Sequence, residues 1–390
     1  MAKVRIAISA PFLSGRKVGV DVFIENIVAE LSREWNLYVY TARPSSFEGL
    51  DVRIRPIPAH TRGQPFRLLW ENTVFRRQLR RDRIALVLSP FSELPVGLPI
   101  PSIAVIHDLT PLILKGVSPW NHTFYFRLAL RLLRTATAIV TVSEYTRRDV
   151  VRTNWFRGKP VYVIYNGTRF PHDTGRTAAN RLGAEPPGGS ANLAAPCVPY
   201  LLYVGGFAPH KNVPFLLEGF AELKDEIRHR LVLVGMGADR VLNETQNQAA
   251  RLGLADRVCI FSGISDEQLV QLYEACDIFI LPSHYEGFGF PLLEAMACGA
   301  PVLSSSASSL PEVGGEAVEY FSPDSKMELV AGIRRLLSDA ELRRQMSRKG
   351  RARAALFTWS RSADAYSALI NELLRRKVGA GQTGPGGPLD

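Results

Sequence analysis

The sequence predicts an α/β protein made of two Rossmann-like, doubly wound domains that face a central cleft. First, 390 residues exceed the ~100–200 residues that one domain usually holds. Second, short apolar segments alternate with amphipathic helical segments, which is typical of a parallel sheet covered by helices on both faces. Third, this alternation stops over residues 174–199 and then restarts. A linker between two domains explains the interruption.

Composition excludes several classes of protein. With 46% hydrophobic and 22% charged residues, the chain is neither disordered nor fibrous. No apolar run reaches the ~18–20 residues of a membrane span, and the first residues lack the apolar core of a signal peptide. Four cysteines lie far apart without a C-x-x-C pair, which argues against disulfides and zinc and favours a cytoplasmic protein. They are Cys197, Cys259, Cys276 and Cys298.

Positive charge is concentrated in the N-terminal half. Residues 1–170 hold 25 Lys and Arg against 12 Asp and Glu, whereas residues 171–390 carry a small net negative charge. A basic domain suits nucleic acid, an anionic lipid surface or a phosphorylated substrate. For any single arginine, a solvated surface charge is the simpler interpretation.

The N-terminal domain, residues 1–173, begins with a strand at Lys3–Ala10, a loop, and a helix with one apolar face. Further helices are expected at 65–81, 119–134 and 144–156. The remaining strands are expected at Leu37–Tyr40, Val52–Ile57, Ile84–Leu88, Ser102–Ile106, Ala138–Val142 and Val161–Ile164.

Residues 174–199 are rich in Gly, Pro, Ala and Ser, so we expect a linker or flexible insertion there. The second domain, residues 200–359, starts with a strand at Tyr200. A C-terminal helix is expected at 360–377, packing back on the N-terminal domain, with a disordered tail at 378–390. The other strands of the second domain are expected at Leu231–Val234, Val258–Phe261, Ile278–Leu281 and Pro301–Ser304.

The stretch 278–305 carries the strongest chemical signal. A buried strand ends at Pro282, a glycine-bearing loop follows, and Pro291 marks the first turn of a helix. Amides of such a loop and the positive helix end attract an anion. Gly287 and Gly289 let the backbone approach a ligand closely.

Two carboxylates, Glu286 and Glu294, flank this helix start and can reach opposite ends of one ligand. Either one alone is more simply read as a charge that favours a helix start. The whole string has no such simple explanation.

The string E-G-F-G-x-P-x-L-E-A-M-A-C-G, with two glutamates eight positions apart, resembles the signature of GT-B glycosyltransferases, specifically the retaining enzymes of glycosyltransferase family 4. Other segments resemble the family in the same order, and the resemblance covers Val4 to about Tyr366 except the linker. They are SGRKVGVDVFIENIVAEL, IAVIHDLTPL, ATAIVTVSEYTRRDV, VYVIYNG, YVGGFAPHKNVPFLLEGF and SSLPEV.

The resemblance implies roles for four residues. Glu286 would face the hydroxyls of the donor sugar, and Glu294 would hold the ribose hydroxyls of the nucleotide. Lys211 would neutralise the departing diphosphate, although a lysine before a helix is often only a solvated charge. His107 would lie near the sugar and the leaving group, although a histidine after a strand is often structural. The other donor-binding candidates are Gly19, Gly206, Gly287, Phe288, Gly289 and Phe290.

One position departs from the family pattern. Where many members carry an arginine that pairs with the lysine on the phosphates, this chain has Gly206. Arg16 and Lys17, with amides of the loop 14–19, are the possible substitutes.

The implied activity is a retaining, metal-independent hexosyl transfer from a nucleotide sugar to a hydroxyl of a glycan or lipid-linked acceptor, without another cofactor. GDP-mannose is favoured as donor, with UDP-glucose and dTDP-rhamnose as alternatives. No D-x-D string occurs, which disfavours a metal-dependent GT-A enzyme. A GT-B epimerase or phosphorylase is the alternative activity. A nucleic-acid-binding protein is disfavoured, because helix-turn-helix, RNP and zinc patterns are absent from the sequence.

The segment 64–83 mixes apolar and basic residues. Phe66, Leu69, Trp70 and Thr73 have helical spacing, and four arginines lie largely off that stripe. These arginines predict attraction to anionic headgroups at the inner face of a membrane. The alternative is that the apolar stripe packs on the sheet and the arginines are solvated. The four are Arg76, Arg77, Arg80 and Arg81.

Overall fold

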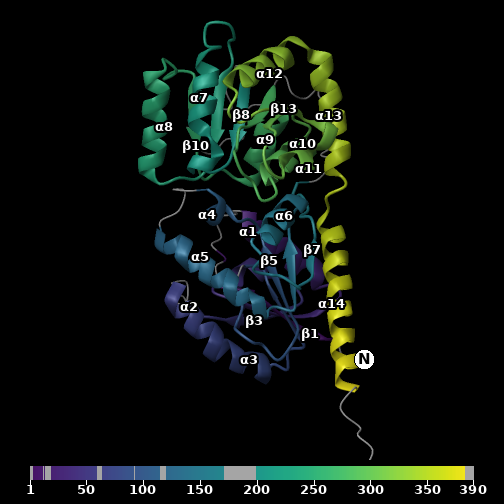
Figure 1. Cartoon of the computed structure of the whole chain (residues 1–390). Helices are drawn as coiled ribbons and strands as arrows, with labels where there is room; N and C mark the ends of the chain where they lie inside the picture. Colours follow the sequence, from purple (N-terminus) through teal and green to yellow (C-terminus); the bar gives the residue numbers. More distant parts are fainter. Residues whose placement is uncertain are drawn as a thin grey trace, which may run out of the picture. The chain divides into compact units, whose positions relative to one another are not determined.

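The computed structural model describes residues 3–11, 13, 19–58, 64–91, 93–114, 120–170 and 199–382. The chain forms two compact units, which are described separately below (Figure 1). Unit 1 consists of Met1–Gly167 and Thr358–Asp390, and unit 2 consists of Thr168–Phe357. Each unit contains one parallel sheet with helices packed on it, as the alternating pattern predicts.

The sheet of unit 1 has seven strands in the order β3-β2-β1-β4-β5-β6-β7, and every pairing is parallel. The chain order therefore reverses between β1 and β4, which are neighbours. The strands are β1 (Arg5–Ala10), β2 (Asn36–Thr41), β3 (Val52–Pro56), β4 (Leu86–Ser89), β5 (Ser102–Ile106), β6 (Ala138–Thr141) and β7 (Val161–Val163).

Helices cover both faces of this sheet, since successive strand residues are buried on opposite sides. Tyr38 and Tyr40 pack in a cluster with Trp70, Phe75 and other helical residues, while the alternate strand positions are also buried. The helices are α1 (Gly19–Leu31), η1 (Pro44–Phe47), α2 (Gln64–Trp70), η3 (Glu71–Phe75), α3 (Arg76–Arg81), α4 (Thr110–Ile113), α5 (Trp120–Leu132), η4 (Leu133–Thr135) and α6 (Glu144–Arg152).

The last helix, α14 (Trp359–Gln382), belongs to unit 1, where it packs against α1 (Figure 1). Trp35 Nε1 donates to Ser367 Oγ at 2.8 Å, and the Tyr162 hydroxyl donates to Glu372 Oε1 at 3.2 Å. The helix continues five residues beyond the predicted end at 377. Glycines such as Gly379 cost a helix only about 1 kcal/mol each, so they weaken it without ending it. The rest of the predicted tail, 383–390, lies outside the described residues.

The sheet of unit 2 has six parallel strands in the order β10-β9-β8-β11-β12-β13. The chain moves outward from β8 through β10 and then returns to β11 on the other side of β8. The strands are β8 (Tyr200–Val204), β9 (Arg230–Val234), β10 (Val258–Phe261), β11 (Ile278–Leu281), β12 (Val302–Ser305) and β13 (Glu319–Phe321).

The helices of unit 2 follow these strands. The buried faces of α7, α10 and α12 are rich in Leu, Val and Ala. The helices are η6 (Pro209–Lys211), α7 (Val213–Ala221), α8 (Asp239–Arg251), α9 (Asp266–Ala275), α10 (Phe290–Cys298), α11 (Leu310–Gly314), η7 (Gly315–Ala317), α12 (Lys326–Ser338) and α13 (Ala340–Ala354).

The predicted strands are confirmed, with shifts of a few residues at their ends. The sequence analysis did not predict β13, which is only three residues long and forms the edge of the sheet. Unit 2 begins at Thr168 rather than after the predicted boundary at 173, and the expected linker 174–199 falls almost entirely outside the described residues. Within the described residues, no helix is both long and apolar enough to span a membrane.

Candidate active site

The candidate site of unit 2 lies where the strand order reverses. Ligands of doubly wound sheets bind at this point, beyond the carboxyl ends of the strands. Here the loops after β8 and β11 run beside each other, and the amide of His284 donates to the carbonyl oxygen of His210 at 2.8 Å. One loop carries Lys211 and the other carries Glu286.

Lys211 and Glu286 form an ion pair across the two loops. The ammonium nitrogen lies 2.8 Å from both carboxylate oxygens of Glu286. The Lys211 side chain is 20% exposed and that of Glu286 only 9% exposed. The structure therefore brings together two residues that are 75 positions apart and were predicted to serve one donor.

Serine side chains fix Glu286 from several directions. Ser283 Oγ donates to Glu286 Oε1 at 2.8 Å, the Glu286 amide donates to Ser308 Oγ at 2.8 Å, and Ser309 Oγ donates to the Glu286 carbonyl at 2.9 Å. Because a carboxylate offers about four acceptor positions, two on Oε1 and one on Oε2 are already used. One position on Oε2 remains for a ligand hydroxyl.

The loop after β11 ends at Gly289, which is the N-cap residue of α10. Its φ is +95°, and a Cβ atom there would lie 2.7 Å from a methyl group of Leu310. Glycine is therefore required at the helix start, and it supplies no side chain to cap the first amides. Phe288 was predicted to bind the donor, but its side chain is 4% exposed and packs edge-on against Phe290 and Phe357. Phe288 can therefore contact a donor only through its backbone. Gly287 and Phe290, which were also predicted to bind the donor, are partly exposed.

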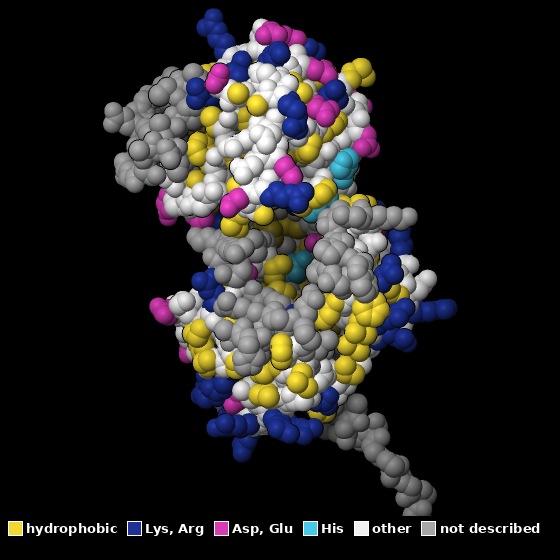
Figure 2. Space-filling model, turned by 90° about the vertical axis from the view of Figure 1, so that its left-hand side faces the viewer, with side chains coloured by type: hydrophobic (Ala, Val, Ile, Leu, Met, Phe, Trp, Pro, Cys, Tyr) yellow, Lys and Arg dark blue, Asp and Glu magenta, His cyan; other side chains and the backbone are white. Residues whose placement is uncertain are grey.

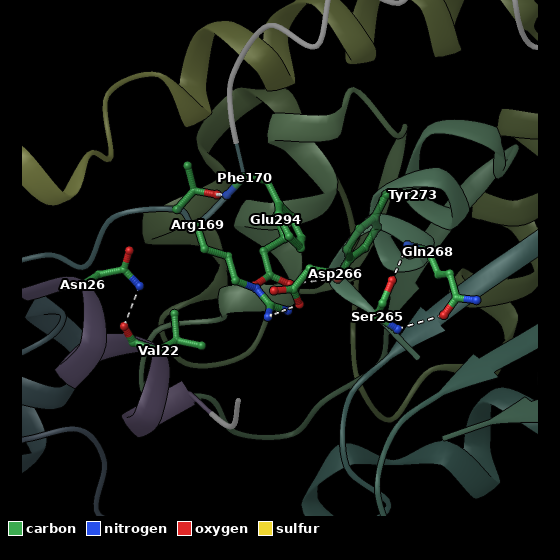
Figure 3. A network of polar contacts seen from close by, with 10 residues as sticks. Val22, Asn26, Arg169, Phe170, Ser265, Asp266, Gln268, Tyr273 and Glu294 are labelled. Atoms are coloured by element: carbon green, nitrogen blue, oxygen red, sulfur yellow. Dashed lines mark hydrogen bonds and ion pairs between the residues drawn. The ribbon is translucent and has the colours of Figure 1, made fainter. Parts of the chain in front are cut away.

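Glu294 lies inside α10 and is almost fully buried in a polar network (Figure 3). Arg169 Nε donates to its Oε1 at 2.7 Å, and the Tyr273 hydroxyl donates to its Oε2 at 3.2 Å. Arg169 also donates to Asp266 Oδ1 at 2.9 Å. Burial raises the pKa of Glu294, while Arg169 and Tyr273 act to lower it. The sequence analysis missed Arg169, because no local pattern links it to residues 97 and 125 positions away.

Gly206 lies in the loop after β8, at the position where the family resemblance predicts an arginine. Among the residues that the structure describes, a Cβ atom there would meet only the carbonyl oxygen of Met236, at 4.0 Å. The backbone itself is held, since the Tyr203 hydroxyl donates to the Gly206 carbonyl at 2.6 Å. The position has space for a side chain and lacks one.

In unit 1, His107 follows β5 at the carboxyl edge of the sheet. Its Nε2 lies 2.9 Å from the carbonyl oxygen of Pro90, which can only accept, so Nε2 carries the proton and Nδ1 is left as an acceptor. Its ring also packs edge-on against Phe23 at 4.9 Å. Burial lowers the pKa of His107, and the imidazole is neutral at pH 7. Asp108 accepts the amide of Thr110 at 2.8 Å and so shapes this loop.

Gly19 is exposed at the first position of α1. The loop that precedes it, including Arg16 and Lys17, lies outside the described residues. Among the residues that are described, no group of three or more His, Cys, Asp or Glu side chains is placed to hold a metal ion.

The basic and apolar segment 64–83 departs from the predicted helical stripe. Phe66 and Leu69 are 61% and 63% exposed, whereas Trp70 is buried and stacks on Phe75. The buried side of α2 runs through Arg67 and Trp70 and continues at Glu71, the first residue of η3, so Phe66 and Leu69 lie outside it. Treating Phe66, Leu69 and Trp70 as one face was therefore wrong.

The four arginines differ in their surroundings. Arg77, Arg80 and Arg81 are exposed, but Arg76 is half-buried and donates to the carbonyls of Val96 and Gly97 at 2.5 and 3.2 Å. Hydrophobic and basic side chains lie close together on the face of unit 1 seen in Figure 2.

Two Rossmann-like units, one with a Lys–Glu pair and a helix start at its switch point, define the chain as a GT-B glycosyltransferase. Sequence models agree: residues 18–169 match the model described as Glycosyltransferase Family 4, and residues 192–353 match the one described as Glycosyl transferases group 1. The chain belongs to glycosyltransferase family 4, as the sequence resemblance predicts.

Individual proteins show the same relationship. O-antigen chain mannosyltransferase B of Escherichia coli is 30% identical over 288 residues, which cover 69% of this chain and 70% of that protein. The serotype-specific mannosyltransferase WbdA of Escherichia coli is 28% identical over 293 residues, covering 73% of this chain and 35% of WbdA. Sucrose-phosphate synthase from Thermosynechococcus elongatus has the same fold, with a TM-score of 0.73, 20% identity and coverage of 96% of this chain and 100% of its own.

Proposed function

We propose that this glycosyltransferase is a retaining mannosyltransferase that transfers mannose from GDP-mannose to a hydroxyl of a glycan or lipid-linked acceptor. The observation that carries the proposal is the ion pair of Lys211 and Glu286 at the switch point of unit 2, beside the uncapped start of α10. The identity to mannosyltransferases favours mannose over glucose and rhamnose.

The residues divide the chemical task between them. Lys211 has three N–H donors, of which two reach Glu286, so one remains for a phosphate oxygen. Together with the amides at the start of α10, it stabilises the negative charge that grows on the departing diphosphate. The free acceptor position of Glu286 holds a sugar hydroxyl, and Glu294 holds the ribose. In unit 1, Nδ1 of His107 can accept from a sugar hydroxyl.

Retention is proposed because these residues do not include a side chain free to attack the sugar. Glu286 is held by Lys211 and Ser283, which lowers its nucleophilicity. The acceptor then approaches on the face from which the diphosphate leaves, and a phosphate oxygen takes the acceptor proton. The C–O bond to phosphate breaks as the new glycosidic C–O bond forms.

A panel of nucleotide sugars tests the donor, because the true donor raises the unfolding temperature of the protein that binds it. We expect GDP-mannose to give the largest shift, and NMR of the product to show the anomeric configuration of the donor. If UDP-glucose or dTDP-rhamnose raised the unfolding temperature more than GDP-mannose, that nucleotide sugar would replace GDP-mannose as the proposed donor. Donor turnover with water or phosphate alone, unaffected by glycan acceptors, would favour an epimerase or phosphorylase.

We also propose that unit 1 docks on an anionic membrane surface, which would place a cytoplasmic enzyme beside a lipid-linked acceptor. The support is that unit 1 carries the exposed side chains of Phe66, Leu69 and Phe124 as well as the exposed arginines of α3. Vesicles with and without phosphatidylglycerol test this in a co-sedimentation assay. Binding should require the anionic lipid, weaken with salt, and fall in the triple variant Arg77→Ser, Arg80→Ser and Arg81→Ser. Equal binding to neutral vesicles, or none, would contradict it.

A further inference from the structure

In the polar network around Glu294, the side chain of Arg169 contacts the carboxylate, although Arg169 lies far outside the motif that contains Glu294. Arg169 is the second residue of unit 2 and its side chain is 15% exposed. Its guanidinium lies over the ring of Phe170 and reaches Glu294 with one nitrogen and Asp266 with another. Figure 3 shows the side chain pointing between these two carboxylates.

We propose that Arg169 is a positioning residue of the donor site, which fixes the orientation of Glu294 and keeps it available to accept from both ribose hydroxyls. The inference rests on the proposed function, in which Glu294 is the ribose ligand. It assigns a role to a residue outside the family motif.

Counting acceptors supports this role. Arg169 occupies one position on Oε1 of Glu294 and Tyr273 occupies one on Oε2. About two positions remain, one on each oxygen, which is the arrangement that two neighbouring hydroxyls need. Asp266 holds Arg169 from the other side, so the guanidinium has little freedom to leave Glu294.

Charge supports it as well, since only an ionised Glu294 can accept on both oxygens. Burial raises the pKa of Glu294, Asp266 raises it further, and Arg169 and Tyr273 lower it. Cys298 on the same helix is neutral, because burial raises its pKa to about 12, and Arg351 on α13 is engaged with the carbonyls of Ala297 and Cys298. Arg169 is therefore the cation in contact with this carboxylate among the groups described around it.

The variant Arg169→Met removes the charge and both hydrogen bonds but keeps an unbranched side chain. We expect its Kd for GDP to rise about tenfold or more near pH ~6 and to recover towards pH ~8.5, because Glu294 then ionises at higher pH. The KM for the nucleotide sugar should rise similarly, with little change in kcat at saturation. Arg169→Lys should restore part of the affinity at low pH. Arg334→Met, which breaks a surface ion pair with Glu226 in the same unit, is the matched control and should bind as wild type.

Glu294→Gln separates positioning from a merely structural role. Its affinity for GDP should be low and independent of pH, and adding Arg169→Met should not restore a pH dependence. An Arg169→Met protein that binds equally or more tightly than wild type, or that loses the same factor at every pH, would overturn the inference. If wild type itself binds neither GDP nor UDP in calorimetry, the proposed function fails instead.

Discussion

Lys211 and Glu286 are the residues whose contacts most directly suggest chemistry. Glu286→Gln keeps the shape but loses the charge that holds Lys211, and Lys211→Ala removes the cation that we assign to the diphosphate. We expect each substitution to lower kcat/KM more than tenfold, a loss of over ~1.4 kcal/mol in transition-state stabilisation. The circular dichroism spectra of both variants should match that of wild type, which would show that folding is preserved.

Lys326→Ala is the control for this prediction. Lys326 is an exposed lysine of the same unit, and it pairs with Glu222 at 3.1 Å far from the motif in sequence. Its activity should equal that of wild type. If a Lys211 or Glu286 variant kept more than about a tenth of the wild-type kcat/KM, that residue would not be catalytic.

Gly206 offers a gain-of-function prediction. Since a Cβ atom at this position is free of close contacts, Gly206→Arg should fold normally and bring a second cation to the phosphates. We expect kcat/KM for the nucleotide sugar to rise by up to about tenfold. Gly206→Gln, of similar length and without charge, should not raise it. Equal behaviour of the two variants would show that the diphosphate charge is already met elsewhere.

Some candidate residues can be named from the sequence and others cannot, for a clear reason. Glu286 and Glu294 lie in one short motif, so a local pattern is enough to propose them as site residues. Arg169 was missed because it meets Asp266 and Glu294 only through folding of unit 2. Phe288 was assigned to the donor from its place in the motif, but burial of its ring depends on Phe357, 69 positions further on.

The π-helical segment η3 contains a buried carboxyl group with a strongly raised pKa. It holds Glu71, which is buried near Arg67, Glu93 and Tyr125. Arg67 donates to Glu93 and contacts Tyr125. Burial and the charge of Glu93 raise the pKa of Glu71 from 4.5 to about 8, although Arg67 lowers it. The side chain is therefore protonated in the folded protein at neutral pH.

This shift predicts how stability changes with pH. Between pH 4.5 and about 8 the unfolded chain releases the Glu71 proton while the folded protein keeps it, so the stability it contributes falls as pH rises. Glu71→Gln should flatten this decline and raise the free energy of unfolding near pH 8.5 by ~1–3 kcal/mol relative to wild type. Urea denaturation at several pH values measures it, with the exposed Glu48→Gln as control. An unchanged slope in Glu71→Gln would contradict the assignment.

Element boundaries show what periodicity can and cannot predict. Strands with alternating or continuous apolar residues were found, because burial of a parallel sheet demands them. The segment 65–81 was predicted as one regular helix. The π-helical segment η3 within it was missed, because the prediction assumed the regular α-helical spacing of apolar residues throughout. The three-residue strand β13 carries too little pattern to detect.

The molecule as a whole should not depend on a metal for turnover. Fixed positive charge from Lys211 and the amides of α10 is assigned to the diphosphate, so sugar transfer should persist in EDTA. We expect kcat to change less than about twofold, within ordinary assay scatter. Complete loss in EDTA that Mn²⁺ or Mg²⁺ restores would reject this assignment of the phosphate site.

The two-domain plan was predictable, because each half repeats the strand–helix alternation and the composition changes between them. The division itself is less simple than the sequence suggested. The chain enters unit 2 at Thr168 and leaves it at Phe357, and these passages adjoin: the Thr168 amide donates to the Phe357 carbonyl at 3.1 Å. Composition cannot reveal such a crossing, because it is fixed by tertiary contacts and not by a change in residue type.

The return of α14 to unit 1 has a consequence for the order in which the protein matures on the ribosome. Unit 2 is continuous in sequence, so it can fold as soon as its own residues emerge. Unit 1 is started first but completed last, because Phe23 and Trp35 of its N-terminal part contact Trp359 and Ser367. Until those residues are synthesised, the part of α1 that packs against α14 lacks this cover, so we expect the incomplete unit 1 to expose apolar surface that the finished protein buries.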